Sequence, residues 1–451
     1  MNLASLLVDH PFADDEPLLC TVDGCLTAGD ARRAAAEVGE RLRSHGLEAG
    51  HAVAVQLPNS PDAVTAMFGT WLAGGVFVPL NVRQTESEVD AAMEATEPAT
   101  FVGVDGVRSR PGAARVFKAD TAFVTWTSGT TGMPKPVLHT HSGYFEILDR
   151  VLGTIRSDAA KRPAPNLIPV SLALNAGIYN VLFGLRAGAA IVIMERFDTA
   201  DFAELVRRFE IRSTVLPAAA ITTLADDDAV TDLAPLRYVR SITAPLSPLA
   251  ARRFHDKFGV TVLNGYGQAE IGEVIGWTAG DAREHPEKLG AVGRPHPGVD
   301  IKVTDDGELL VRPPRTAAGL DPGRVDSDGF VQTGDLASID ADGFVWIEGR
   351  IGDVINRGGN KVFPDHVEEV LRLSPAVRDV AVVGVPDERL GEVPVAFVVG
   401  GAERSELEAL CREHLVPYKV PVAFVDIDVL PRSEVGKVLR RELVARYEDK
   451  R

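Results

Sequence analysis

The sequence predicts an α/β protein with a large N-terminal domain of doubly wound sheets, a small antiparallel, barrel-like part, and a small C-terminal α+β domain. The chain has 451 residues, and at about 150 residues per domain this is enough for two or three domains. Helical and strand patterns alternate through the first hundred residues, which favours a parallel sheet covered by helices on both faces. From residue 300 onward, short strands joined by Asp-Gly turns indicate antiparallel pairing.

The first predicted helix, residues 28–43, places Ala31, Ala35, Val38 and Leu42 on one face, as the helical repeat requires. Ser60 and Pro61 are typical of a helix start, so another helix is predicted there. The elements predicted after residue 50 are strand 51–57, helix 60–74, strand 76–80, helix 85–96, strand 100–104 and strand 121–126.

A change of pattern near residue 350 predicts a domain boundary. The segments before it, 300–314 and 330–350, carry the antiparallel signature. Those after it alternate as helix 364–373, strands 377–384 and 393–399, helix 403–415, strand 423–430 and helix 437–447. We therefore expect a large domain over residues 1–349 and a small domain over 350–451, with the connection at 350–353.

Charge and cysteine content exclude several classes of protein. The chain carries 64 acidic and 47 basic residues, a net charge of −17, without a basic stripe that could bind nucleic acid or an anionic membrane. Cys20, Cys25 and Cys411 form no CxxC pair and cannot build a disulfide framework, so reduced thiols are expected. No signal peptide and no apolar run of membrane-spanning length occurs, so a cytoplasmic location is predicted.

A loop rich in hydroxyl residues and glycine follows the strand 121–126 and predicts a phosphate site. Hydroxyl groups and backbone N–H groups in such a loop can surround phosphate oxygens. Pro134 stands where the P-loop pattern needs glycine, so a P-loop NTPase is disfavoured. The candidate phosphate-binding residues are Thr127, Ser128, Gly129, Thr130, Thr131, Gly132 and Lys135.

This loop resembles that of the acyl-adenylate-forming superfamily, which includes acyl-CoA synthetases, the adenylation domains of peptide synthetases and firefly luciferase. Further segments resemble family motifs and occur in the family's order. They are GVFVPLN at 75–81, NGYGQAE at 264–270, Gly293-Arg294-Pro295 with Pro297-Gly298, Thr333-Gly334-Asp335, Gly349-Arg350, Gly358-Gly359-Asn360 and PRSEVGK at 431–437. The resemblance covers nearly the whole chain.

The resemblance implies a chemistry that explains these residue types. A carboxylate attacks the α-phosphorus of ATP and expels pyrophosphate, so cations and hydrogen-bond donors must neutralise the developing charge. It implies that Glu270 ligates Mg²⁺ and that Lys437 bridges the acid and the α-phosphate. It also implies an adenine and ribose site formed by Thr243, Ala244, Asn264, Gly265, Tyr266, Gly267, Asp335 and Arg350.

By the same resemblance, the small domain is mobile and turns after adenylation to present a second face. That face would carry Gly358 and Gly359 along a channel for the pantetheine arm of coenzyme A, since glycine permits close backbone approach. ATP/AMP, Mg²⁺ and coenzyme A are therefore the expected cofactors and cosubstrates.

The segments expected to hold the acid are apolar. They comprise Leu174, Ala176, Tyr179, Ile242 and Ala244, and they predict an acid with an uncharged tail. No Asp stands in residues 169–180 to hold an ammonium group, so an amino acid substrate is disfavoured. The sequence departs from the family pattern at Pro136, Ile242, Ala269 and Gly352.

The function predicted from the sequence is that of an ATP-dependent carboxylic acid–CoA ligase acting through an acyl-adenylate. The alternatives are a ligase that only forms the thioester from a preformed acyl-adenylate, and an adenylating enzyme that loads a carrier protein. A nucleotide-binding protein without catalytic activity is the alternative from a different class. The expected partners are a small carboxylic acid and CoA or a carrier protein, with neither nucleic acid nor membrane.

Overall fold

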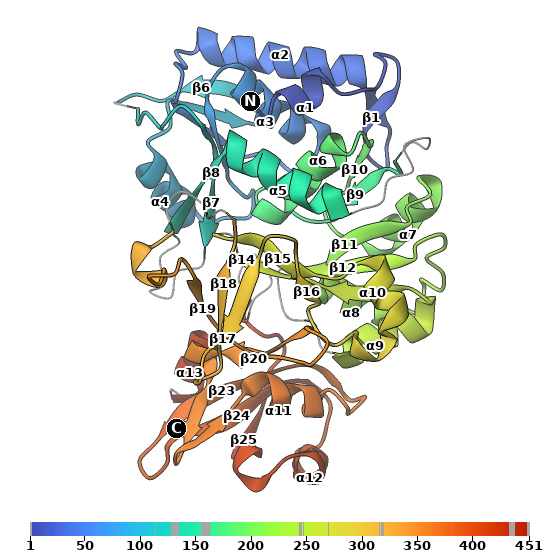
Figure 1. Ribbon diagram of the computed structural model, residues 1–451, viewed down its shortest axis with the longest axis vertical. Coiled ribbons are helices and arrows are strands. Elements are labelled where there is room, and N and C mark those ends of the chain that lie inside the picture. The colour runs from blue at the N-terminus through green and yellow to red at the C-terminus, as the bar shows by residue number, and fades with distance from the viewer. Residues whose placement is uncertain are drawn as a thin grey trace.

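In the computed structural model, a large part built from residues 2 to about 350 lies above a smaller C-terminal part (Figure 1). The structure describes residues 2–112, 114–127, 135–154, 163–242, 246, 248–268, 270–314, 316, 320–432 and 438–448. Within these residues, no helix is long and apolar enough to cross a membrane.

A six-stranded sheet in the order β6-β5-β3-β4-β7-β8 forms the N-terminal part of the large domain. Its four central strands are parallel, and the edge strands β6 and β8 are antiparallel to their neighbours. The strands are β3 Ala52–Val55, β4 Val76–Pro79, β5 Thr100–Gly103, β6 Gly106–Ser109, β7 Thr121–Thr127 and β8 Lys135–Thr140. The helices are α1 Ser5–Val8, α2 Ala28–Ser44, α3 Pro61–Leu72 and α4 Glu86–Thr96.

Local capping explains where these helices begin. The Ser60 hydroxyl accepts a hydrogen bond from the backbone N–H of Ala63 at 3.2 Å, with Pro61 in the first turn, as predicted. Thr85 and Glu88 form a reciprocal capping box at the start of α4. Each cap satisfies helix N–H groups that have no partner inside the helix.

The second part of the large domain contains two sheets in the orders β2-β1-β10-β9 and β11-β12-β13. Strands β11, β12 and β13 are parallel. The strands are β1 Pro17–Cys20, β2 Cys25–Thr27, β9 Asn166–Ile168, β10 Ile191–Ile193, β11 Ser213–Pro217, β12 Tyr238–Ile242 and β13 Thr261–Asn264. The helices are α5 His141–Thr154, α6 Asn175–Arg186, α7 Thr199–Arg208, α8 Ala218–Asp226 and α9 Pro248–Phe258.

Antiparallel strands follow, which confirms the change of pattern near residue 300. They form the sheets β14-β15-β16 and β17-β18-β19-β20. The elements are β14 Tyr266–Gln268, β15 Gly272–Gly276, α10 Ala279–Glu284, β16 Arg294–Pro295, β17 Asp300–Val303, β18 Glu308–Arg312, β19 Val331–Ile339 and β20 Val345–Arg350.

The C-terminal part is an α+β unit with its own core. Its sheet has the order β22-β21-β24-β23, with β25 paired to β24. Two separate clusters of buried residues include side chains of β23 and β24, as expected for a sheet covered on both faces. The elements are β21 Ile355–Arg357, β22 Asn360–Val362, α11 Pro364–Leu371, β23 Val377–Asp387, β24 Gly391–Gly400, α12 Arg404–His414, β25 Ala423–Asp426 and α13 Arg440–Glu448.

A disulfide between Cys20 and Cys25 corrects the expectation of reduced thiols. The two residues end β1 and begin β2, and the antiparallel register places them directly opposite each other with Cα atoms 4.0 Å apart. The two cysteines are five residues apart, so CxxC spacing does not reveal a pair that the hairpin brings together. Cys411 is buried in the C-terminal part and is not in a disulfide.

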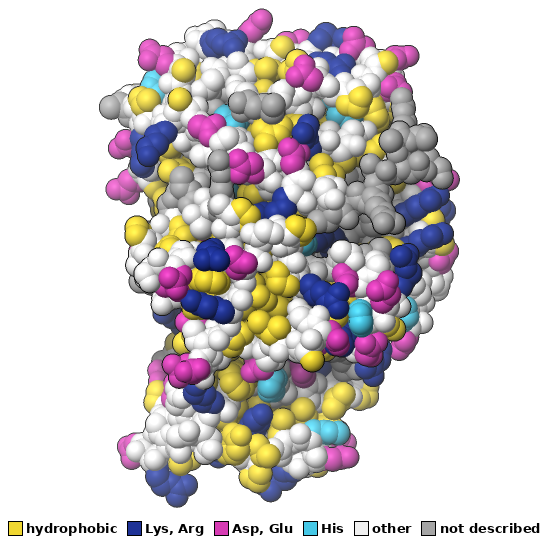
Figure 2. Space-filling view, in the orientation of Figure 1, with side chains coloured by type: hydrophobic (Ala, Val, Ile, Leu, Met, Phe, Trp, Pro, Cys, Tyr) yellow, Lys and Arg dark blue, Asp and Glu magenta, His cyan; other side chains and the backbone are white. Residues whose placement is uncertain are grey.

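Acidic and basic side chains are mixed over the face of the molecule shown in Figure 2, and no stripe of one sign crosses it.

Arg440 connects three carboxylates inside the C-terminal part. Its guanidinium donates to Glu368 at 2.7 Å and to Asp365 at 3.2 Å, and it lies 3.7 Å from Asp353. Only 7% of the Glu368 side chain is exposed. Burial alone would raise the pKa of Glu368, but the charges of Arg440 and Arg372 hold it below the usual value.

Arg440→Ala should destabilise the C-terminal part by about 3–5 kcal/mol, because it leaves Glu368 buried without its main counter-charge. Arg412→Ala is the matched control, because Arg412 forms an exposed pair with Glu408 and should cost less than about 0.5 kcal/mol. Hydrogen exchange at the Val382 amide, which donates to Glu368, reports the change. Equal exchange rates in the two variants would contradict this assignment.

Candidate active site

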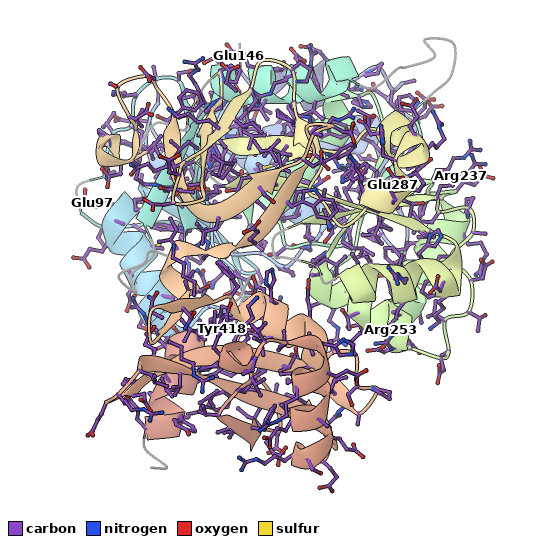
Figure 3. The ribbon with its side chains drawn as sticks, turned by 60° about the horizontal axis from the view of Figure 1, so that its bottom comes forward. Glu97, Glu146, Arg237, Arg253, Glu287 and Tyr418 are labelled. Carbon is purple, nitrogen blue, oxygen red and sulfur yellow. A yellow bond between two sulfur atoms is a disulfide. The ribbon has the colours of Figure 1, made fainter. Side chains whose placement is uncertain are left out.

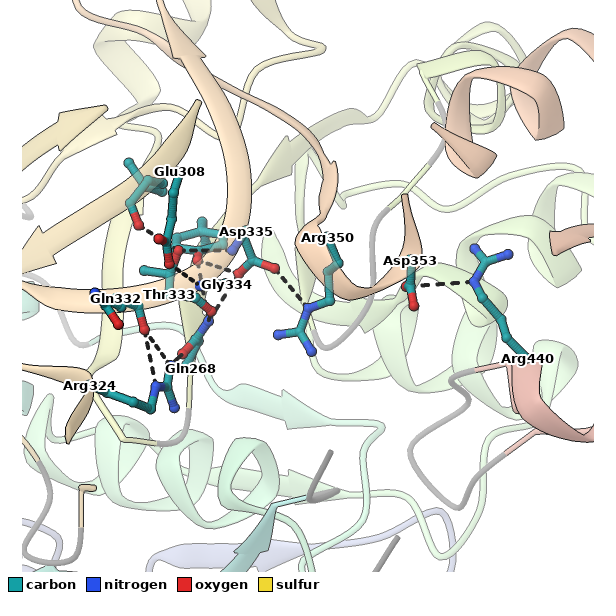
Figure 4. A network of polar contacts seen from close by, with 12 residues as sticks. Gln268, Glu308, Arg324, Gln332, Thr333, Gly334, Asp335, Arg350, Asp353 and Arg440 are labelled. Atoms are coloured by element: carbon teal, nitrogen blue, oxygen red, sulfur yellow. Dashed lines mark hydrogen bonds and ion pairs between the residues drawn. The ribbon is translucent and has the colours of Figure 1, made fainter. Parts of the chain in front are cut away.

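The carboxylate of Asp335 is the centre of a polar network that joins several of the predicted motifs (Figure 4). Its Oδ2 accepts from the Tyr266 hydroxyl at 2.5 Å and from Gln268 Nε2 at 2.9 Å. Its Oδ1 accepts from Arg350 Nε at 2.8 Å. Residues far apart in the chain thus meet at one carboxylate that is 7% exposed.

Strand geometry explains why these side chains converge. Tyr266 and Gln268 are two residues apart on β14, so both point to the same face. Asp335 and Arg350 stand directly opposite each other in the antiparallel pair β19 and β20. Thr333 Oγ1 also accepts from the Asp335 N–H at 3.1 Å, which fixes the backbone of the Thr333-Gly334-Asp335 turn.

The electrostatic environment keeps the donors of this network protonated. Burial, together with the nearby charge of Asp335, raises the pKa of Tyr266 well above its usual value. Burial disfavours the charged form of Arg350, but the Asp335 carboxylate more than offsets this and raises the pKa of Arg350. Both side chains can therefore donate to the carboxylate at neutral pH.

Glu270 lies beside this network and contacts Arg324. Arg324 Nη1 is 3.4 Å from Glu270 Oε1, and its Nη2 donates to Gln268 Oε1 at 2.9 Å. The sequence analysis did not identify Gln268 or Arg324. Gln268 lies inside a quoted motif and shares the face of Tyr266, so strand periodicity could have identified it; nothing local in the sequence marks Arg324.

The structure describes the two ends of the predicted phosphate loop but not its middle. Thr127 and Lys135 are paired in register at the ends of β7 and β8, and only their backbone is described. Asn264 is a buried residue at the end of β13, and Gly265 follows it. The predicted residues outside the described part of the chain are Ser128, Gly129, Thr130, Thr131, Gly132, Thr243, Ala244 and Lys437.

Gly358 and Gly359 form the two-residue turn between β21 and β22. Their φ angles are +57° and +85°, and Arg357 pairs with Asn360 across the turn. A two-residue hairpin turn of this kind needs positive φ at both central positions, which favours glycine. The hairpin turn thus explains why glycine stands at both positions, independently of the predicted CoA channel.

The predicted acid-binding residues Leu174, Ala176 and Tyr179 all lie at the start of α6. Ile242 ends β12, and only its backbone is described. The surroundings of Tyr179 are less apolar than the sequence predicts. The charges of Arg150, Arg240 and Glu273 all act on its hydroxyl.

Comparison with known proteins extends these observations to the whole chain. The sequence profile of the AMP-binding enzyme family matches residues 12–119 and 107–320, and that of the AMP-binding enzyme C-terminal domain matches residues 366–437. The 4-coumarate–CoA ligase-like 9 protein of Oryza sativa subsp. japonica is 32% identical over 92% of this chain and 87% of its own length.

Two solved structures have the same fold over nearly their full length. ATP-bound MatB from Rhodopseudomonas palustris aligns over 100% of both chains with a TM-score of 0.88 and 26% identity. The amide bond synthetase McbA from Marinactinospora thermotolerans aligns over 99% of both chains with a TM-score of 0.84 and 26% identity.

The fold and these comparisons thus define a ligase with a large α/β domain and a small C-terminal domain. The chain belongs to the AMP-binding enzyme family, the acyl-adenylate-forming superfamily that its motifs resemble. Within this family it is an acyl-CoA ligase, an acid–thiol ligase.

Gly267→Ala and Gly265→Ala should differ in their effect on stability, which shows at which of the two positions the fold itself requires glycine. A Cβ at Gly267 would lie 2.2 Å from the carbonyl oxygen of Gly272, so Gly267→Ala should destabilise the β14–β15 hairpin by about 1–3 kcal/mol. The nearest atom to a Cβ at Gly265 would be Glu273 Oε1 at 3.4 Å, an ordinary contact, so Gly265→Ala should retain wild-type stability. Thermal unfolding monitored by circular dichroism measures both; equal destabilisation would refute the distinction.

Proposed function

We propose that this ligase joins a carboxylic acid to CoA through an acyl-adenylate. We also propose that it works in the cytoplasm, where ATP and CoA are available, with the Cys20–Cys25 disulfide as an exception to the reduced state of thiols there. The observation that carries this proposal is the convergence of Tyr266, Gln268 and Arg350 on the Asp335 carboxylate. It supports a nucleotide site between the large domain and the connection to the small domain.

The free acceptor capacity of Asp335 fits a nucleoside. A carboxylate can accept about four hydrogen bonds, and the described residues supply one to Oδ1 and two to Oδ2. One position on Oδ1 therefore remains for a ribose hydroxyl. We assign Asp335 to the ribose, Arg350 to the nucleotide, and Asn264, Gly265, Tyr266, Gly267, Thr243 and Ala244 to the region of the adenine.

Glu270 fits a Mg²⁺ site that is completed by phosphate oxygens. The described residues contain no group of three or more His, Cys, Asp or Glu side chains that could hold a metal by themselves. Mg²⁺ at nucleotide sites commonly takes only one or two carboxylates, with the remaining ligands from phosphates and water. When bound, the ion would offset negative charge on the phosphates.

The first step needs positive charge where the acid meets the α-phosphate. The acid carboxylate attacks the α-phosphorus, a new C–O–P linkage forms, and the bond to pyrophosphate breaks. We propose that Lys437 bridges the two anions, the acid and the α-phosphate, during this attack. The loop 127–135, which includes Lys135, holds the β- and γ-phosphates. Donors already in place lower the cost of the charge that develops.

The second step transfers the acyl group from AMP to the thiol of CoA. We propose that the small domain, residues 350–451, turns against residues 1–349 around 350–353 and brings Gly358 and Gly359 to the thiol channel. An added Cβ at Gly352 would have no neighbour within 4 Å, which supports a connection with room to rotate. The acceptor is CoA, and a carrier-bound pantetheine is its alternative.

A thioester assay tests this proposal. The purified chain is incubated with ATP, Mg²⁺, CoA and a panel of aliphatic, aromatic and dicarboxylic acids, and acyl-CoA and AMP are measured. Turnover with free CoA supports the proposal. A parallel assay with a phosphopantetheinylated carrier protein identifies a carrier-specific enzyme, and no thioester with either acceptor would overturn the proposal.

Lys437→Ala should slow the first step selectively. Loss of one preorganised charge-stabilising donor costs about 3–4 kcal/mol, or roughly 10²–10³ in rate, so pyrophosphate release should fall by this factor. Thioester formation from a supplied acyl-adenylate should stay near the wild-type rate, because the small domain has then turned away. Equal losses in both steps would refute this role.

The same two assays on the wild-type chain separate a complete ligase from a half-enzyme. A chain that forms thioester from supplied acyl-adenylate but releases no pyrophosphate from acid and ATP catalyses only the second step. Pro136, which lacks a backbone donor, and Ala269, which lacks a hydroxyl, are the departures from the family pattern that motivate this control.

A further inference from the structure

Three polar side chains, Arg240, Glu273 and His296, form a buried cluster next to Gly265, which we call the Arg240 cluster. Arg240 on β12 is ion-paired with Glu273 on β15, and His296 Nε2 lies 3.3 Å from Glu273 Oε1. The side chains of Arg240 and Glu273 are 25% and 18% exposed. An added Cβ at Gly265 would lie 3.4 Å from Glu273 Oε1, so the cluster borders the residue that precedes Tyr266.

The Arg240 cluster satisfies its own charges. Burial opposes ionisation of Glu273, but Arg240 and His296 hold the pKa of Glu273 below its usual value, so it remains a carboxylate. The pair of Arg240 and Glu273 then carries no net charge. Because the two side chains are only partly exposed and are paired with each other, they act as a fixed wall rather than as groups free to bind a ligand ion.

Two hydrogen-bond donors beside this wall lack partners. The Tyr179 hydroxyl and the Arg150 Nε are buried and make no hydrogen bond within the described chain. Both groups lie close enough to Glu273 for its charge to act on them. Burial raises the pKa of Tyr179, so its hydroxyl stays a donor at neutral pH. Buried donors without partners cost free energy that a ligand acceptor would recover.

Arg150 supplies positive charge at this position. Burial lowers the pKa of its guanidinium despite attraction by Tyr179, Glu146 and Glu273, so its surroundings do not fully compensate its charge. Glu146 and Asp149 on the same helix are exposed, and Asp149 is paired with Arg186 at 2.8 Å. Figure 3 shows Glu146 at the outer edge of the molecule.

A cavity of about 580 Å³ adjoins Arg150 and reaches Gly276 and His296. This volume falls within the range of small-molecule sites, roughly 300–1,000 Å³. Gly276 packs tightly against the Arg240 cluster, because a Cβ there would lie 2.9 Å from both Glu273 Oε1 and His296 Cε1. There is thus room for the far end of an acid beside Arg150, whose Nε lacks a partner in the described chain.

We propose that the acid substrate carries a second carboxylate at its far end, which accepts hydrogen bonds from Arg150 and from the Tyr179 hydroxyl. This rests on the proposed function, because it places the reacting carboxylate near Gly265 and Tyr266. A substrate with a second carboxylate differs from the acid with an uncharged tail that the sequence predicts. Arg240 and Glu273 neutralise each other and do not contact the substrate in this arrangement. The positive charge of Arg150 therefore determines which substrate charge is preferred.

The test compares dicarboxylic acids with monocarboxylic acids of equal length from four to eight carbons. We expect kcat/KM for thioester formation to be at least about tenfold higher for the best diacid than for its matched monoacid, since a site built to hydrogen-bond a group rejects an analogue without it. Arg150→Met and Tyr179→Phe should each raise KM for the diacid by a larger factor than KM for the matched monoacid, because only the diacid loses a hydrogen-bonded carboxylate. Arg186→Met, an exposed substitution on α6, is the control.

Calorimetric titration of the same acids into wild-type and Arg150→Met protein gives a readout independent of turnover. Binding of the diacid that depends on Arg150 supports the inference even if no thioester forms, in which case the proposed function fails alone. Turnover of monoacids in preference to diacids, or a preference that Arg150→Met and Tyr179→Phe both leave unchanged, overturns the inference while the ligase activity stands.

Discussion

The arrangement of the site depends on the need to satisfy one buried carboxylate, that of Asp335. A carboxylate with so little exposure is stable only if donors surround it, and these come from β14 and from β20. The two antiparallel sheets, β14-β15-β16 and β17-β18-β19-β20, are thereby joined at this carboxylate. Because Arg350 is also the last residue of β20, the same requirement holds the start of the C-terminal part against the site.

Local sequence signals were sufficient for most elements and for the centre of the site. The helix expected at 85–96 is Glu86–Thr96, because Thr85 and Glu88 cap it within one turn. Tyr266 and Asp335 stood in recognisable motifs and do meet. Arg324, Arg240 and Glu273 could not be predicted, since their partners lie tens of residues away and on other elements. The Cys20–Cys25 pair was missed because it depends on the β1–β2 register.

Glycines in the motifs illustrate why a sequence pattern alone leaves two explanations open. The lack of a side chain at Gly267 is explained by the carbonyl group of Gly272, without any ligand. Gly358 and Gly359 are equally explained by their hairpin turn. Buried donors are more informative, because a buried donor atom without a hydrogen-bond partner in the described chain has no comparable structural explanation. This is why the chemistry of the substrate is better argued from Arg150 and Tyr179 than from any glycine.

Two ion pairs flank residues 351 and 352, around which we propose that the small domain turns. Arg350 is bonded to Asp335 of the large domain, and Asp353 lies 3.7 Å from Arg440 of the small domain. Between them, Ile351 is 48% exposed, and an added Cβ at Gly352 would meet no atom within 4 Å. Each ion pair anchors its own side of the connection. A change of backbone torsion confined to residues 351 and 352 would therefore turn the domains without breaking either one.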